Sequence, residues 1–188
     1  PKWMTGMTNR NIKDQSSIIR GGVMKVRLAE ISDLKYVHSL SKIESNALGF
    51  IPNTAYEAAI TGEKTGKRWS NTCNDKLWLC EENGDTVGFL LMSFGRWSKV
   101  NQIAIQEDAR RIERGKALLD AGMKHGQSRG IQDFACGCAD DLPSNQFWKG
   151  VGWKQLGDRK GISHKNTWKE TSKRKVNIYH FQQNSLFF

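Results

Sequence analysis

Long apolar runs are missing from this sequence. No window holds about 18 consecutive apolar residues, the minimum for a membrane-spanning helix, so we expect no membrane span. The opening stretch PKWMTGMTNRNIKDQ has no apolar core of the kind found in secretory signals. Only four cysteines occur in 188 residues, which does not suggest a disulfide framework at this length. These absences predict a protein of the reducing cytoplasm.

Acidic residues are also scarce relative to basic ones. The chain has 19 Asp and Glu against 29 Lys and Arg, which gives a formal net charge of +10. Such an excess favours polyanionic partners, either nucleic acid or a phosphate-bearing cofactor. A solvated basic surface without a specific partner is an equal alternative, because charge alone does not define a site.

The apolar residues, 38% of the chain, are sufficient for one domain with a core. We expect residues 1–22 to be a polar N-terminal extension and residues 23–188 to be one domain. The order of elements predicts an α/β fold, a mixed sheet with helices on both faces. The patterns predict strands at 23–28, 76–80, 86–94, 98–105, 131–138, 153–156 and 176–181, helices at 34–47, 54–60 and 144–151, a further helix ending near 128, and a basic linker at 157–175.

One stretch, IAIQEDARRIERGKALL at residues 103–119, indicates a binding site. It is typical of a short strand, a tight arginine-rich turn around Gly115, and the first turns of a helix. The free N–H groups and the positive dipole at a helix N-terminus bind anions. Full positive charges would add to these partial ones, and we expect the ligand to be a pyrophosphate. The charged residues are Arg110, Arg111, Arg114 and Lys116.

From about Met24 to Phe181 the chain resembles the GCN5-related N-acetyltransferase (GNAT) superfamily. The resemblance is carried by IAIQEDARRIERGKALL, the strand IQDFACGC and the segment NQFWKGVGW, in this order. The first is similar to the superfamily's acyl-CoA motif, Arg/Gln-x-x-Gly-x-Gly/Ala after a strand. Arg110 takes the leading position and Gly115 the second glycine, whereas Glu113 replaces the first glycine. Glu113 must therefore turn away from the phosphates.

The resemblance implies a mostly antiparallel sheet of six or seven strands, the GNAT fold, and acetyl-CoA as co-substrate without a metal. Backbone N–H groups of the turn would bind the pyrophosphate, and the edge of the strand at 103–105 would pair with the pantetheine amides. The segment from Asn145 to Trp153 is similar to the superfamily's asparagine/aromatic helix followed by a Gly-aromatic pair. The residues that the resemblance assigns to the cofactor are Ile103, Ala104, Ile105, Arg110, Arg111, Arg114, Gly115, Lys116, Asn145 and Trp148.

The resemblance also suggests catalytic groups. The amide of Ile105 would polarise the thioester carbonyl, as an oxyanion hole does. The strand at 98–105 contains no Glu, Asp or His, so the candidate general bases are Glu107 and Asp141, with Asp140, His38 or a water relay as alternatives. Trp148 occupies the position at which many members have a tyrosine that acts as the general acid. The indole N–H of Trp148 is only a hydrogen-bond donor, so we expect Trp148 either to pack against the cofactor or to belong to the core.

These features predict an N-acetyltransferase that moves an acetyl group from acetyl-CoA to an amine of unknown identity. The segments 46–53 and 157–175 would line the acceptor site by the same resemblance. Segment 157–175 carries seven Lys and Arg against two acids, which suits a polyanionic or nucleic-acid acceptor. The alternatives are a nucleic-acid-binding or DNA/RNA-modifying protein on a GNAT scaffold, and a catalytically silent fold. A homodimer is compatible with either activity.

Overall fold

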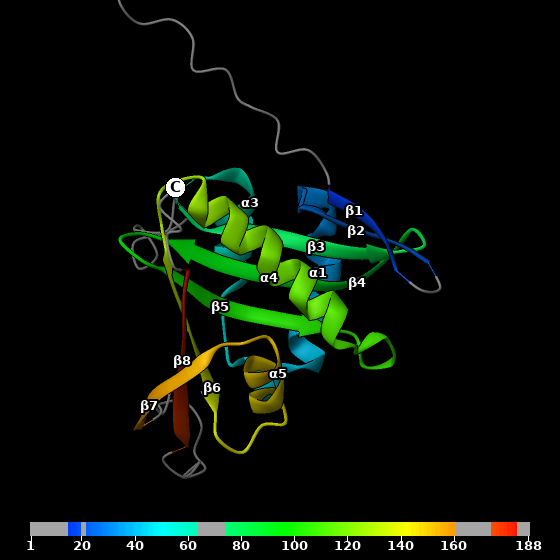
Figure 1. Ribbon diagram of the computed structural model, residues 1–188. Coiled ribbons are helices and arrows are strands. Elements are labelled where there is room, and N and C mark those ends of the chain that lie inside the picture. The colour runs from blue at the N-terminus through cyan, green and yellow to red at the C-terminus, as the bar shows by residue number, and fades with distance from the viewer. Residues whose placement is uncertain (1–14, 20–21, 64–73, 161–173, 184–188) are drawn as a thin grey trace, which may run out of the picture.

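A computed structural model describes residues 15–19, 22–63, 74–160 and 174–183, which form one sheet with helices on both faces (Figure 1). In this part of the chain the sheet has eight strands in the order β1-β2-β3-β4-β5-β6-β8-β7. The strands are β1 Gln15–Ile19, β2 Gly22–Leu28, β3 Lys76–Glu82, β4 Asp85–Phe94, β5 Ser98–Ile105, β6 Asp133–Ala139, β7 Lys154–Lys160 and β8 Lys175–Gln182. The helices are α1 Leu34–Ile43, α2 Ser45–Leu48, α3 Asn53–Thr61, α4 Ile112–Gln127 and α5 Ser144–Gly150.

The predicted mixed, mostly antiparallel sheet is confirmed. Only the β5–β6 pair is parallel among the described strands, and α4 is the crossover helix between them. β1 adds an eighth strand to the six or seven expected. It pairs with β2, so the sheet begins before the domain boundary predicted at residue 23. Within the described residues no helix combines the length and apolarity that crossing a membrane would require.

Three predicted boundaries need correction. The helix predicted at 34–47 breaks at Glu44, which separates α1 from the short α2. β7 continues to Lys160 and β8 starts at Lys175, so the ends of the predicted basic linker are strands. Its central part, residues 161–173, lies outside the described residues.

The sheet carries a separate apolar cluster on each face. One cluster packs the sheet against α4 and α5 and includes Leu118, Phe134 and Trp148. The other packs it against α1 and α3 and includes Tyr56 and Phe89, both almost completely buried. In Figure 1, α4 crosses the front of β3 and β4. Burial on both faces explains why the central strands are apolar without alternation, as in the run from residue 87 to 92.

A β-bulge at Asn101 changes the course of β5. Leu91 is opposite Gln102 and Met92 is opposite Val100, so Asn101 is an extra residue on β5. A bulge reverses the alternation of side chains and bends the strand. Val100 and Ile103 consequently contact the same apolar cluster, although three positions separate them. The β5–β6 pairing ends at Val100, next to the bulge.

Candidate functional site

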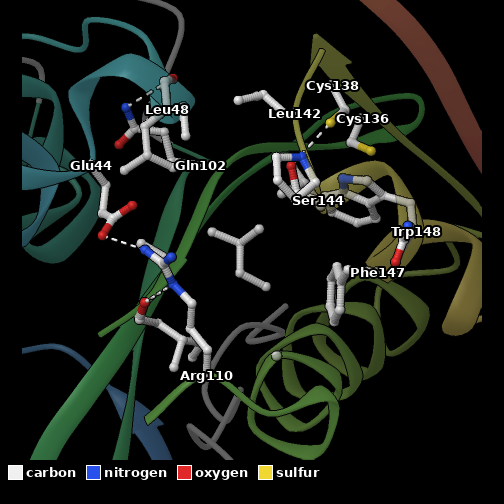
Figure 2. Close-up of a pocket in the computed structure, with 18 of the residues that line it drawn as sticks. Glu44, Leu48, Gln102, Arg110, Cys136, Cys138, Leu142, Ser144, Phe147 and Trp148 are labelled. Atoms are coloured by element: carbon white, nitrogen blue, oxygen red, sulfur yellow. Dashed lines mark hydrogen bonds and ion pairs between the residues drawn. The ribbon is translucent and has the colours of Figure 1, made fainter. Parts of the chain in front are cut away.

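The two parallel strands diverge beyond the bulge and leave a pocket between them. β6 pairs with β5 only along Ser98–Val100, so the remaining part of β5 faces open space instead of a strand. A cavity of about 570 Å³ lies there, within the size range of small-molecule sites. Its walls come from the second half of β5, the end of β6, the start of α5, the end of α2 and the turn before α4 (Figure 2).

The backbone of β5 directs polar groups into this pocket. The amide of Gln106 donates to the carbonyl of Val87, so these two residues form a hydrogen-bonded pair of the antiparallel ladder. Hydrogen-bonded and non-hydrogen-bonded pairs alternate along such a ladder. Ile105 and Ile103, opposite Gly88 and Leu90, are therefore non-hydrogen-bonded positions with respect to β4. Their N–H and C=O groups point away from β4, toward the side that β6 has left.

The N-terminus of α4 opens on the same pocket. The N-cap residue is Arg111, and its side chain makes no capping hydrogen bond, so the first amides of α4 lack that partner. Arg110, Arg111 and Gly115 all line the cavity. The Arg110 guanidinium donates from Nε to the carbonyl of Ile105 at 3.3 Å and from Nη2 to Glu44 at 2.5 Å. Partial and full positive charges thus converge at one end of the pocket.

The other charged residues of the turn point elsewhere. Arg114 is buried, and its Nη2 donates to both carboxylate oxygens of Glu82 on β3. Lys116 pairs with Asp120 one turn along the exposed face of α4, at 2.7 Å. Neither residue is part of the pocket lining, so our proposal for the anion site leaves both out. Glu113 is exposed and also lies outside the lining, the orientation that its place in the motif requires.

Gly115 has a packing reason to be glycine. Its φ is not positive, but a Cβ there would lie 2.7 Å from Cε2 of Phe147 on α5. The absence of a side chain lets α4 approach α5 at the pocket wall. Behind Phe147, Trp148 is 4% exposed, lines the pocket and packs against Trp153 and Tyr179. Trp148 therefore belongs to the core, one of the two expected alternatives, and also to the pocket wall, where its packing against a cofactor stays a prediction.

Asn145 does not line the pocket; its side chain forms hydrogen bonds within the fold. Its Nδ2 donates to the carbonyls of Ala139 and Leu142, each at 2.7 Å. Its Oδ1 accepts from Asn177 and from the hydroxyl of Tyr179, each at 3.0 Å. These bonds fix the loop between β6 and α5 to β8. The side chain thus positions the wall of the pocket, and its hydrogen-bonding groups are already used.

The two predicted general bases, Asp141 and Glu107, both lie outside the pocket lining. Asp141 is exposed and forms a two-point ion pair with Arg174, at 2.8 and 2.9 Å. The hydrogen bonds from Arg174 lower the pKa of Asp141, which weakens it as a base. Glu107 is exposed in the turn Glu107–Ala109.

Glu44 and Gln102 are among the polar residues of the pocket that were not expected from the sequence. Glu44 lines the cavity with a carboxylate that is 18% exposed. Gln102, which is 3% exposed, accepts a hydrogen bond from Tyr56 at 2.5 Å and donates to the carbonyl of Gly49 at 3.1 Å. Figure 2 shows Glu44 and Gln102 on the opposite wall from Ser144 and Trp148. Glu44 is at a helix break that periodicity did not reveal, so the sequence held no signal for it.

Cys136 and Cys138 are both buried on β6, two residues apart, and both border the pocket. Burial raises the pKa of both thiols, so they stay protonated and poorly nucleophilic. Cys138 is 3.2 Å from the hydroxyl of Ser144. In the part of the chain that the structure covers, no three His, Cys, Asp or Glu side chains gather as a metal site would require.

Comparisons with known proteins agree with this geometry. The chain matches the model of the acetyltransferase (GNAT) family over residues 46–153, more than half of its length. No curated protein matches it.

Solved structures with the same fold include three that are named as ribosomal-protein acetyltransferases, two of them RimL. RimL, a ribosomal L7/L12 alpha-N-protein acetyltransferase, superposes with a TM-score of 0.68 at 17% identity over 90% of this chain and 95% of its own. RimL in complex with coenzyme A gives 0.64 at 16% identity over 89% and 98%. The ribosomal-protein-S18-alanine N-acetyltransferase from Escherichia coli gives 0.62 at 14% identity over 88% and 99%. With the family model covering more than half of its residues, the chain belongs to the acetyltransferase (GNAT) family.

Proposed function

We propose that this protein transfers the acetyl group of acetyl-CoA to a primary amine in the pocket between β5 and β6. The observation that carries the proposal is the divergence of these strands after Val100, beside the N-terminus of α4. It supplies two features of an acyl-CoA site at once: strand amides for an extended chain and helix amides for a pyrophosphate. Family membership and the RimL complex with coenzyme A support the same ligand.

Each pocket wall has a role in this proposal. The first amides of α4, with Arg110 and Arg111, bind the pyrophosphate. The N–H and C=O groups of Ile103 and Ile105, with Ala104 between them, pair with the pantetheine arm. The amide of Ile105 donates to the thioester oxygen as negative charge develops there, and Trp148 closes the apolar side of the cavity.

The acceptor is the second part of the proposal, and a protein N-terminus is our first candidate. Solved structures named as ribosomal-protein N-acetyltransferases cover 84–90% of this chain. A peptide would enter from the side of α2, where Ala47 and Leu48 line the cavity and Phe50 is 76% exposed.

A nucleic-acid acceptor or partner is the alternative, favoured by the basic charge. β7 is exposed along its whole length and carries Lys154, Arg159 and Lys160 against Asp158. Phosphate binding by such a strand would weaken steeply between about 50 and 200 mM salt. Affinity for a duplex or single strand that does not change over this range would contradict the alternative.

The test of the main proposal combines binding with transfer. Acetyl-CoA should raise the melting temperature in a concentration-dependent manner, because it binds the folded state. Peptides with a free α-amine, incubated with acetyl-CoA and the protein, should gain an acetyl group, which mass spectrometry detects. Control peptides that have a blocked N-terminus and contain no lysine should not gain one. No change in melting temperature at millimolar acetyl-CoA would refute coenzyme binding, and acetylation of lysine side chains alone would refute the N-terminal acceptor.

A further inference from the structure

One carboxylate faces the pocket, and no established role accounts for it. Among the described residues that line the cavity, Glu44 is the sole Asp or Glu. Its backbone lies at the break between α1 and α2, a position fixed by the hydrogen bond from its amide to the carbonyl of Leu40. The side chain is 18% exposed, so it keeps limited access to water through the cavity.

Arg110 places this carboxylate close to the expected reaction centre. The same guanidinium donates to Glu44 at 2.5 Å and to the carbonyl of Ile105 at 3.3 Å (Figure 2). Glu44 is thus separated by one guanidinium from the residue whose amide would polarise the thioester. The other wall of the cavity carries Ser144, Trp148 and the two cysteines of β6. Burial raises the pKa of the Cys136 and Cys138 thiols, so neither is a base.

The wall that carries Glu44 is also held firmly. Gln102 donates to the carbonyl of Gly49 at 3.1 Å, and Arg174 donates to the carbonyl of Asn46 at 2.8 Å. Together with the Arg110 contact, these bonds connect the α2 segment to β5, to the residue that precedes β8 and to the turn before α4. A catalytic carboxylate requires this kind of support, because small displacements of a reacting group lower rates strongly.

We propose that Glu44 is the general base for the acceptor amine, and that Arg110 occupies its carboxylate until the pyrophosphate of the coenzyme attracts the guanidinium. This inference rests on the proposed function and adds a residue and an order of events to it. A carboxylate paired with a guanidinium is occupied by that cation, whereas the same carboxylate without it can accept a hydrogen bond from an ammonium ion. The coenzyme therefore binds first and the amine second.

The reaction then balances as follows. Glu44 removes one proton from the acceptor ammonium, and the neutral amine attacks the thioester carbonyl carbon to form a C–N bond. The C–S bond breaks, the thiolate of coenzyme A leaves, and the second proton of the nitrogen neutralises it. Glu44 returns its proton to water through the open cavity. The net products are the acetylated amine, coenzyme A and one proton.

Binding of coenzyme A, measured without any acceptor, tests whether Glu44 and the pyrophosphate compete for Arg110. If Glu44 competes for the guanidinium, Glu44→Gln should tighten coenzyme A binding roughly two- to fivefold, the magnitude of one partly exposed ion pair. Arg110→Ala should weaken binding, and adding Glu44→Gln to Arg110→Ala should have no further effect. The matched control is Glu57→Gln, an exposed carboxylate on α3 outside the pocket lining, with unchanged affinity.

Calorimetric titration of the wild type and these four variants with coenzyme A measures the five affinities. If the wild type and Glu44→Gln bind coenzyme A with the same affinity, the competition between Glu44 and the pyrophosphate for Arg110 is refuted, and the proposed function is unaffected. Wild-type protein that does not bind coenzyme A would overturn both.

Acetyl transfer to the peptide mixture tests the base itself. Glu44→Gln should lower kcat about 10²- to 10⁴-fold without raising the KM for acetyl-CoA, the effect expected from loss of a general base. Arg110→Ala should instead raise that KM and largely keep kcat. If Glu44 only held Arg110 in place, the two variants would change the same parameter, and that result would overturn the catalytic role.

Discussion

Arg114 has a structural role, in contrast to Arg110 and Arg111, for which we propose ligand binding, and its replacement gives a prediction of defined size. Its side chain is 10% exposed and is paired with Glu82, which is 28% exposed. Removing one partner of a fully buried pair costs about 3–5 kcal/mol, whereas an exposed pair contributes about 0–1 kcal/mol. Because Glu82 keeps contact with water, we expect Arg114→Ala to lower the free energy of unfolding by about 2–3 kcal/mol.

Urea denaturation followed by tryptophan fluorescence measures this loss. Replacing both partners, as in Arg114→Met with Glu82→Met, should recover part of it, because no unpaired carboxylate remains. At temperatures where the single variant stays folded, its affinity for coenzyme A should equal that of the wild type. A loss of under about 0.5 kcal/mol would refute the importance of the pair. A fall in coenzyme affinity as large as that of Arg110→Ala would show that Arg114 binds the ligand after all.

Three further predictions follow from single contacts. Gly115→Ala should weaken coenzyme binding by displacing the Phe147 ring, and Phe147→Leu in the same protein should restore it; titration with coenzyme A that shows no rescue would contradict the contact. Ile105→Pro removes the amide that faces the pocket and should lower kcat about 10²- to 10³-fold in the peptide assay, whereas Ile105→Val keeps the amide and the rate; equal rates in a folded proline variant would contradict the oxyanion role. Burial lowers the pKa of His125, so the native state binds fewer protons than the unfolded chain, and stability should decrease as pH falls below about 6.5; His125→Leu should reduce this slope in urea titrations at several pH values, and an unchanged slope would contradict it.

The sequence was most informative where a periodic pattern coincided with a turn signal. Asn83 and Gly84 adopt positive φ values of 54° and 93°, the turn that an Asn-Gly pair favours between β3 and β4. Gly130, with φ of 80°, follows α4, and a glycine in this conformation is a common signal for the end of a helix. The strand, turn and helix N-terminus of the motif at residues 103–119 are local features, and several of its residues line the cavity; that they bind a ligand stays a prediction.

Side-chain direction could not be predicted in the same way. Arg110 and Arg114 are four residues apart in a single motif, yet Arg110 lines the pocket before α4 and Arg114 on α4 is buried and paired with Glu82 of β3. Their partners, Glu44 and Glu82, are 66 and 32 residues away in sequence. The bulge at Asn101 that opens the pocket depends on its register with β4, and no local pattern encodes that register. Long-range pairing therefore determines which residues of a recognisable motif can act.

The most direct test of the account is a crystal structure of the protein with acetyl-CoA. We expect the pantetheine arm along residues 103–105 and the thioester oxygen within hydrogen-bond distance of the Ile105 amide. The pyrophosphate should lie at the first amides of α4, with the Arg110 guanidinium moved from Glu44 toward it. Acetyl-CoA bound outside the space between β5 and β6 would contradict the account, as would a thioester that faces away from Ile105.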